Sequence, residues 1–129
     1  MKSLLLTILL SSFAFSNISI FISQNNKLIK VSQKDLANLY LKKTNTINGI
    51  KVTPIDSQNK KLFQEFYKKV VKKNPKQLHA YWMKQIYRGN TLPPKKLSPK
   101  ALKKAMKKNE HIIAYQKNPK TGRILLTIK

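Results

Sequence analysis

The sequence contains no cysteine and only four acidic residues, and these two shortages exclude several kinds of chemistry. Without cysteine the chain has no disulfide, no zinc site built from thiolates, no thiol nucleophile and no lipoprotein anchor. A pair of catalytic carboxylates would require two of the four acids to converge, and their spacing gives no sign of this. These acids are Asp35, Asp56, Glu65 and Glu110.

Histidine, glycine and arginine are also scarce. His79 and His111 lack the spacing of metal ligands, and the three glycines form no phosphate-binding loop. We therefore expect no metal, no cofactor, no catalytic residue and no enzyme activity. Arg88 and Arg123 are the only arginines, although arginine is the side chain that best recognises phosphates and bases. This imbalance argues against nucleic acid as the partner.

Lysine, in contrast, is abundant. The chain has 27 lysines and arginines against 4 acids, which gives a formal net charge of +23. Most of the lysines fall on the polar faces of amphipathic helices, where solvation alone explains them. The charge is either functional or the result of an AT-rich coding sequence, which enriches lysine, asparagine and isoleucine together.

The first sixteen residues resemble a secretory signal peptide. Lys2 precedes an apolar run at residues 4–10, and the small residues Ala14 and Ser16 occupy the −3 and −1 positions of a cleavage site. We expect cleavage after Ser16, a periplasmic or secreted protein, and one domain over residues 17–129. The alternative is an uncleaved anchor in the inner membrane. No charge follows Lys2 until Lys27, and about 20 residues suffice to span a bilayer.

Short strands alternate with amphipathic helices, a pattern that predicts an α/β fold with a mixed sheet. Ser32 and Asp35 form a capping box at one helix start, and Asn74 and Ser98 each precede a proline that favours another. A turn signal at 118–122 predicts that the last two strands form a hairpin. We expect strands at 17–23, 50–55, 111–115 and 124–128, helices after Ser32, at 59–73, after Asn74 and after Ser98, and loops at 42–50 and 89–97.

One loop favours anion binding. Residues 56–61 join the end of a predicted strand to a helix N-terminus, where free N–H groups and the helix dipole attract anions. Ligands of open α/β sheets bind beside such strand ends. Ser57 and Asn59 add polar side chains, and Lys60 and Lys61 add positive charge. These four residues are the predicted ligand contacts, and an ordinary capped helix start is the alternative interpretation.

The order of these signals resembles the small exported proteins of the periplasmic-binding-protein-like superfamily, which are related to phosphate transporter substrate-binding proteins. The resemblance implies a single three-layer-like lobe of a type II binding protein, with a short mixed sheet and packed helices. The loop at 56–61 departs from the family pattern because it lacks glycine and threonine. A second departure is in the strand before Tyr115, where relatives have glycine and this chain has His111 and Ala114. The matching stretches are 31–41, 47–56, 62–66, 81–82, 86–89, 93–94 and 111–115.

We therefore expect an exported binding module for phosphate or another small anion, connected with transport. The alternative is a cationic envelope protein that interacts with anionic lipid, lipopolysaccharide or an acidic protein partner. The oligomeric state and the transporter partner are left open by the sequence.

Overall fold

Strand β1 (Ile18–Ile22) lies at the start of the described part of the chain, which covers residues 17–129 of a computed structural model. All five of its residues are buried. Because side chains alternate along a strand, Ile18, Ile20 and Ile22 join one hydrophobic cluster and Phe21 joins another on the opposite face. The strand predicted at 17–23 is confirmed. The predicted leader at 1–16 lies outside the described residues.

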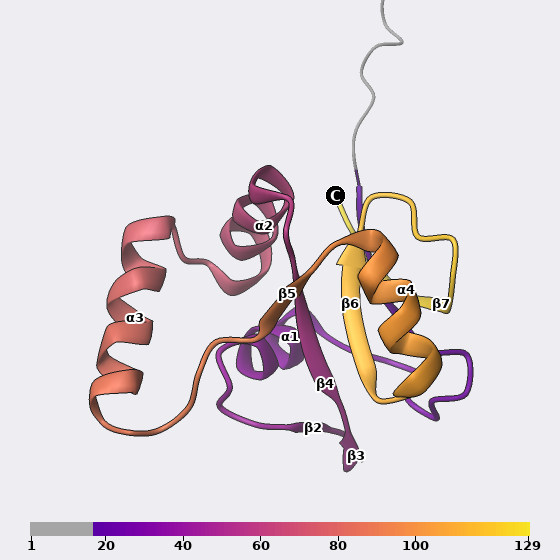
Figure 1. The fold of residues 1–129 in the computed structure, drawn as a ribbon, viewed down its shortest axis with the longest axis horizontal. Coiled ribbons are helices and arrows are strands. Elements are labelled where there is room, and N and C mark those ends of the chain that lie inside the picture. The colour runs from indigo at the N-terminus through magenta and orange to yellow at the C-terminus, as the bar shows by residue number, and fades with distance from the viewer. Residues whose placement is uncertain (1–16) are drawn as a thin grey trace, which may run out of the picture.

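The main sheet has five strands in the order β5-β4-β6-β1-β7 (Figure 1). β1 runs antiparallel to both β6 and β7, whereas β4 runs parallel to β5 and β6, so the sheet is mixed. Two short strands, β2 and β3, form a separate pair. The predicted α/β architecture is confirmed at this level. The remaining strands are β2 (Thr46–Ile47), β3 (Ile50–Lys51), β4 (Thr53–Ser57), β5 (Lys95–Leu97), β6 (Ile112–Gln116) and β7 (Arg123–Ile128).

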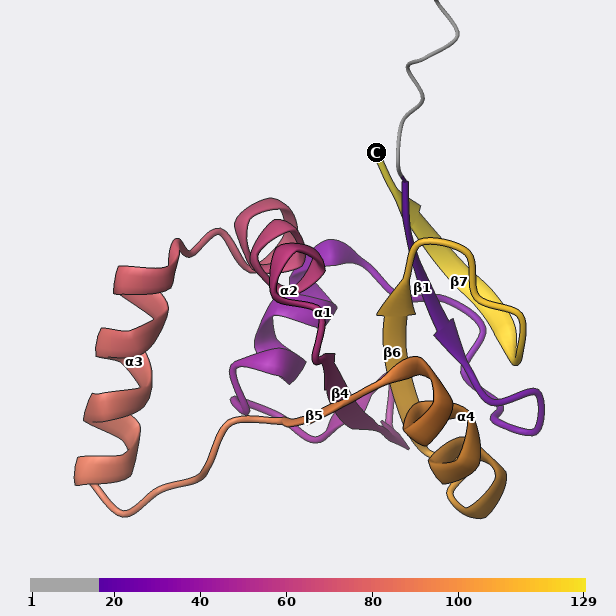
Figure 2. The ribbon, with the colours of Figure 1, turned by 45° about the horizontal axis from the view of Figure 1, so that its top comes forward.

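Helices cover both faces of the sheet. The cluster on one face contains apolar residues of α1, α2, η2 and α3, and the cluster on the other contains Leu102 and Met106 of α4. Figures 1 and 2 show α4 close to β6, and α3 at the edge of the molecule. In residues 17–129 no helix combines the length and the apolar character needed to cross a bilayer. The helices are α1 (Gln33–Tyr40), α2 (Lys60–Phe66), the π-helix η2 (Tyr67–Val71), α3 (Pro75–Tyr87) and α4 (Pro99–Lys108).

The predicted hairpin between the last two strands is wrong. β6 and β7 do not pair with each other, because β1 lies between them and pairs with both (Figure 2). The connection at 117–122 therefore runs back along β1. It passes so close that a Cβ on Gly122 would lie 2.4 Å from the carbonyl oxygen of Ile22, and Gly122 has a positive φ of 75°. Residues 117–122 bend twice but form no hydrogen-bonded turn, because they cross β1 to reach its far edge.

Four predicted boundaries also need correction. The helix predicted at 59–73 ends its α-helical part at Phe66 and continues as the π-helix η2. The loop predicted at 89–97 contains the edge strand β5, and the loop predicted at 42–50 contains β2. The strand predicted at 50–55 is two strands, and β4 continues to Ser57. Proline has no N–H to donate to a neighbouring strand. Pro54 is tolerated near the start of β4 because it pairs with β6 on one side only, and pairing with β5 on the other side begins at Ile55.

Candidate functional site

A buried carboxyl group lies near the carboxyl end of β4. Asp56 is only 3% exposed, and each of its oxygens accepts a hydrogen bond from a tyrosine. The Tyr67 hydroxyl donates to Oδ2 and the Tyr115 hydroxyl donates to Oδ1, both at 2.8 Å. Tyr67 belongs to η2, 11 residues along the chain, and Tyr115 belongs to β6, 59 residues along, so the carboxyl group joins three separate elements.

Aromatic packing holds the two tyrosines in place. The Tyr115 ring stacks on Phe66 with 3.8 Å between ring centroids, and Phe66 meets Tyr67 edge to face at 5.5 Å. Tyr40 of α1 contacts all three rings, and its hydroxyl donates to the carbonyl oxygens of Ile55 and Ile113. Edge-to-face pairs of this kind add about 0.5–1.5 kcal/mol each beyond the burial of their area. The acceptor and both donors are therefore rigidly placed.

Burial controls the protonation of this cluster. It raises the pKa of Asp56 to about 7, because desolvation outweighs the hydrogen bonds from the two tyrosines and the charges of Lys96 and Lys42. Burial and the nearby Asp56 charge also raise the pKa of Tyr67 and Tyr115 far above the usual range. Both tyrosines consequently remain hydrogen-bond donors throughout the physiological pH range.

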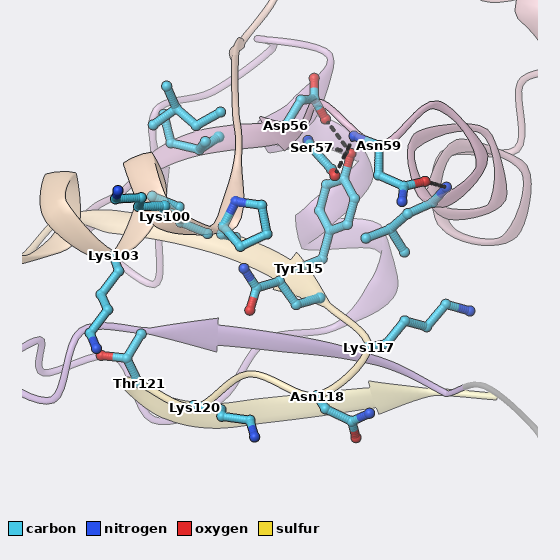
Figure 3. A pocket seen from close by; sticks show the side chains of 17 residues that line it. Asp56, Ser57, Asn59, Lys100, Lys103, Tyr115, Lys117, Asn118, Lys120 and Thr121 are labelled. Atoms are coloured by element: carbon cyan, nitrogen blue, oxygen red, sulfur yellow. Dashed lines mark hydrogen bonds between the residues drawn. The ribbon is translucent and has the colours of Figure 1, made fainter.

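A cavity of about 680 Å³ opens next to this cluster. It lies at the carboxyl ends of β4 and β6, with Asp56 and Ser57 on one strand and Tyr115 and Gln116 on the other (Figure 3). The chain leaves β4 towards β5 on one side and leaves β6 towards β7 on the other. Neighbouring strands whose connections leave in opposite directions create a crevice, which is where open α/β sheets bind ligands.

Four lysines contribute to the cavity wall. Lys100 and Lys103 come from the first turns of α4, and Lys117 and Lys120 come from the connection between β6 and β7 (Figure 3). Among the lining residues, Asp56 is the sole acid, and tyrosine hydroxyls occupy both of its oxygens. The wall therefore offers mobile positive charge with little competing negative charge.

Polar and apolar groups complete the lining. Ser57 and Tyr115 are linked, since the Ser57 N–H donates to the Tyr115 hydroxyl at 3.2 Å. The polar side chains are Ser57, Asn59, Gln116, Asn118 and Thr121, and the apolar ones are Ile55, Leu62, Leu97, Pro99, Leu102 and Ala114.

Only two of the four predicted contact residues reach this cavity. Ser57 and Asn59 line it, whereas Lys60 and Lys61 are exposed on α2 and are absent from its lining. The Asn59 side chain accepts from the Leu62 N–H, so the predicted helix cap is present, and the Ser57 hydroxyl accepts from the Asn59 N–H. Ser57 and Asn59 therefore form an ordinary capped helix start and also line the cavity.

Sequence reasoning missed the lysines of α4 and of the connection, and it gave Asp56 no role. The sequence does carry one signal for the Asp56 cluster, which is an acid placed directly after apolar strand residues. An acid at such a position is usually buried only when it has hydrogen-bond partners. Nothing in the sequence indicates that Tyr67 and Tyr115 are those partners. Within the described residues, no cluster of three or more His, Asp or Glu side chains is arranged to hold a metal ion.

Comparisons with protein-family models, with curated proteins and with solved structures found no match to this chain.

The raised pKa of Asp56 predicts a pH-dependent stability. An unfolded aspartate has a pKa of about 3.9, so between this value and about 7 the folded chain holds a proton that the unfolded chain has lost. The free energy of unfolding should consequently fall as pH rises, by about 2–3 kcal/mol from pH 5 to pH 8. Urea unfolding followed by circular dichroism at several pH values measures this slope.

Asp56→Asn removes the titrating group and is expected to flatten that part of the slope. Glu110→Gln removes an exposed acid and serves as the matched control, which should retain the wild-type slope. An unchanged slope in Asp56→Asn would contradict the assignment.

Proposed function

We propose that this chain is a non-enzymatic binding module that holds a small anion in the cavity at the ends of β4 and β6. The observation that supports it is the convergence of four lysines, from two separate segments, on one cavity at a strand switch point. Phosphate, sulfate and carboxylates all belong to the ligand class that this charge favours.

The electrostatics of the cavity support an anion in three ways. Lys100 and Lys103 lie near the N-terminus of the ten-residue helix α4, whose dipole adds positive potential. Asp56, with its pKa of about 7, carries only part of a charge near neutral pH. The whole chain, at +23, also steers anions towards it.

The ion pairs of the described residues leave most of these lysines available. Within residues 17–129 the ion pairs are those of Glu65 with Lys69 and with Lys117. Lys117 is thus held by a carboxylate 2.8 Å away, whereas Lys100, Lys103 and Lys120 have no carboxylate partner within that part of the chain. These three ammonium groups are free to bind an incoming anion.

The cellular setting is part of the same proposal. The leader-like residues 1–16 favour export and cleavage after Ser16, with an uncleaved inner-membrane anchor as the alternative. The resemblance to type II binding proteins and the cavity beside the strand ends together favour one binding-protein lobe that works with a transporter.

The lysines of α4 allow a direct test. Lys100→Ala with Lys103→Ala should weaken binding of inorganic phosphate, sulfate or acetate at least tenfold, since hydrogen bonds to charged groups contribute about 1.5–3 kcal/mol each. Isothermal titration calorimetry at constant ionic strength measures the affinity.

The matched control is Lys104→Ala with Lys107→Ala, which removes the same charge from the same helix outside the cavity. Lys60→Ala should likewise leave the affinity unchanged. The proposal fails if no anion gives a saturable signal, or if both double variants lose affinity equally.

A second candidate function, docking on an anionic lipid surface, is favoured by the outer face of α3. Met83, Ile86 and Tyr87 are 48%, 43% and 93% exposed and occupy neighbouring positions on one side of the helix. Leu78 and Trp82 face the core instead. An apolar stripe without a partner on a surface helix is typical of an interaction site.

The charge and the position of α3 favour a lipid surface over a protein groove. The helix carries Lys76 and Lys84, is followed by Arg88 at its C-cap and contains no acid. It lies at the periphery in both ribbon views, so its outer side is accessible to a flat surface (Figures 1 and 2). Basic amphipathic helices bind anionic bilayers in this way.

Trp82, the only tryptophan, lies next to Met83 but on the core-facing side of α3, so brominated acyl chains can quench its fluorescence only when the helix itself enters the bilayer. With the full chain, vesicles of phosphatidylglycerol with brominated acyl chains should quench Trp82 fluorescence, and brominated phosphatidylcholine vesicles should not. Met83→Ser with Tyr87→Ser should abolish most of the quenching, because the apolar stripe no longer enters the bilayer.

Ile29→Ser with Ile124→Ser removes two exposed apolar side chains elsewhere and is the matched control, expected to retain quenching. Equal loss in both double variants, or equal quenching by both lipids, would exclude docking through α3.

A further inference from the structure

The cavity is larger than a simple oxyanion requires. Its volume of about 680 Å³ corresponds to about twenty water molecules, at about 30 Å³ of liquid volume each. Pockets for organic ligands measure about 300–1,000 Å³. An inorganic phosphate bound by the lysines would leave most of the cavity to water.

The inner wall of the cavity is apolar. Ile55, Leu102 and Ala114 belong to the hydrophobic cluster between the sheet and α4, and Leu97 packs against it. Leu62 contributes from the other face of the sheet. Water against these side chains has few hydrogen-bond partners, so its replacement by an apolar group is favourable. These apolar side chains have no hydrogen-bond donor for an inorganic oxyanion.

The positive groups surround this apolar region. Figure 3 shows Lys100 and Lys103 on one side of the view and Lys117 on the other, with Tyr115 drawn between them. Lys100, Lys103 and Lys120 are exposed. Long lysine side chains can keep their ammonium groups in water while their stems cover apolar surface. A ligand would therefore bind with its anionic group at the rim and its apolar part inside.

We infer that the ligand is an organic anion, a carboxylate or phosphate monoester attached to an apolar group about the size of a phenyl ring, and not free phosphate. This inference rests on the proposed anion-binding function and specifies its ligand class. The carboxylate and the phosphate ester share the chemistry that the cavity recognises, namely an anionic head on an apolar body.

Two matched pairs of probes test the inference by calorimetry at constant ionic strength. Phenyl phosphate should bind at least tenfold more tightly than inorganic phosphate, and benzoate should exceed acetate by a similar factor. Leu97→Ser should reduce the advantage of phenyl phosphate about fivefold and leave the affinity for inorganic phosphate unchanged. Leu92→Ser changes an exposed leucine outside the cavity and should alter neither affinity.

The possible failures are distinguishable. Equal affinities for phenyl phosphate and inorganic phosphate, both weakened by Lys100→Ala with Lys103→Ala, would overturn the inference and leave the anion site standing. Phenol binding as tightly as phenyl phosphate would overturn the anion-binding proposal itself. If Leu97→Ser still binds phenyl phosphate more tightly than inorganic phosphate by the wild-type factor, the phenyl ring does not bind against this wall.

Discussion

The buried carboxyl group of Asp56, held by two tyrosine hydroxyls, is the interaction on which the arrangement of this molecule depends. It connects β4 to η2 through Tyr67 and to β6 through Tyr115. A buried charge is costly in free energy, and the cost appears here as a pKa of about 7. Each carboxyl oxygen accepts one hydrogen bond, so the cluster specifies how β4, η2 and β6 meet.

The cavity follows from this arrangement. Tyr115 donates to Asp56 and accepts from the Ser57 N–H, so it fixes the ends of the two central strands relative to each other. Their connections then leave in opposite directions and place lysines of α4 and of the 117–122 connection around one opening. The π-helix η2 contributes Tyr67 to the cluster and buries Val70 and Val71 beside it. Such helical irregularities often accompany functional sites.

Local signals predicted the elements well. The capping box of Ser32 and Asp35 and the Asn59 cap are present with the expected hydrogen bonds, and β1 was expected from its apolar residues. These signals act within about four residues, so the sequence displays them directly. The mixed α/β class followed from the same alternation of patterns.

Long-range pairing was not predictable in the same way. The β6–β7 hairpin was wrong because an internal strand from the start of the chain competes for both partners, and no local signal encodes that competition. Asp56 and Tyr115 are 59 residues apart, and the lysines of the cavity come from segments that only the fold brings together. Lys60 and Lys61 were chosen for their proximity in sequence, whereas the cavity lies on the side of β4 that faces α4 and the 117–122 connection.

We propose that anions bind in this cavity and are not held by the general positive charge of the surface. Amide chemical-shift mapping by NMR tests it most directly, with inorganic phosphate titrated into the isotope-labelled full chain at constant ionic strength. Binding in the cavity should give saturable shifts concentrated at Ser57, at Lys100 to Lys103 and at residues 116–121, with little change along α3. Shifts spread evenly over the exposed lysines, or concentrated at Lys60 and Lys61, would contradict it.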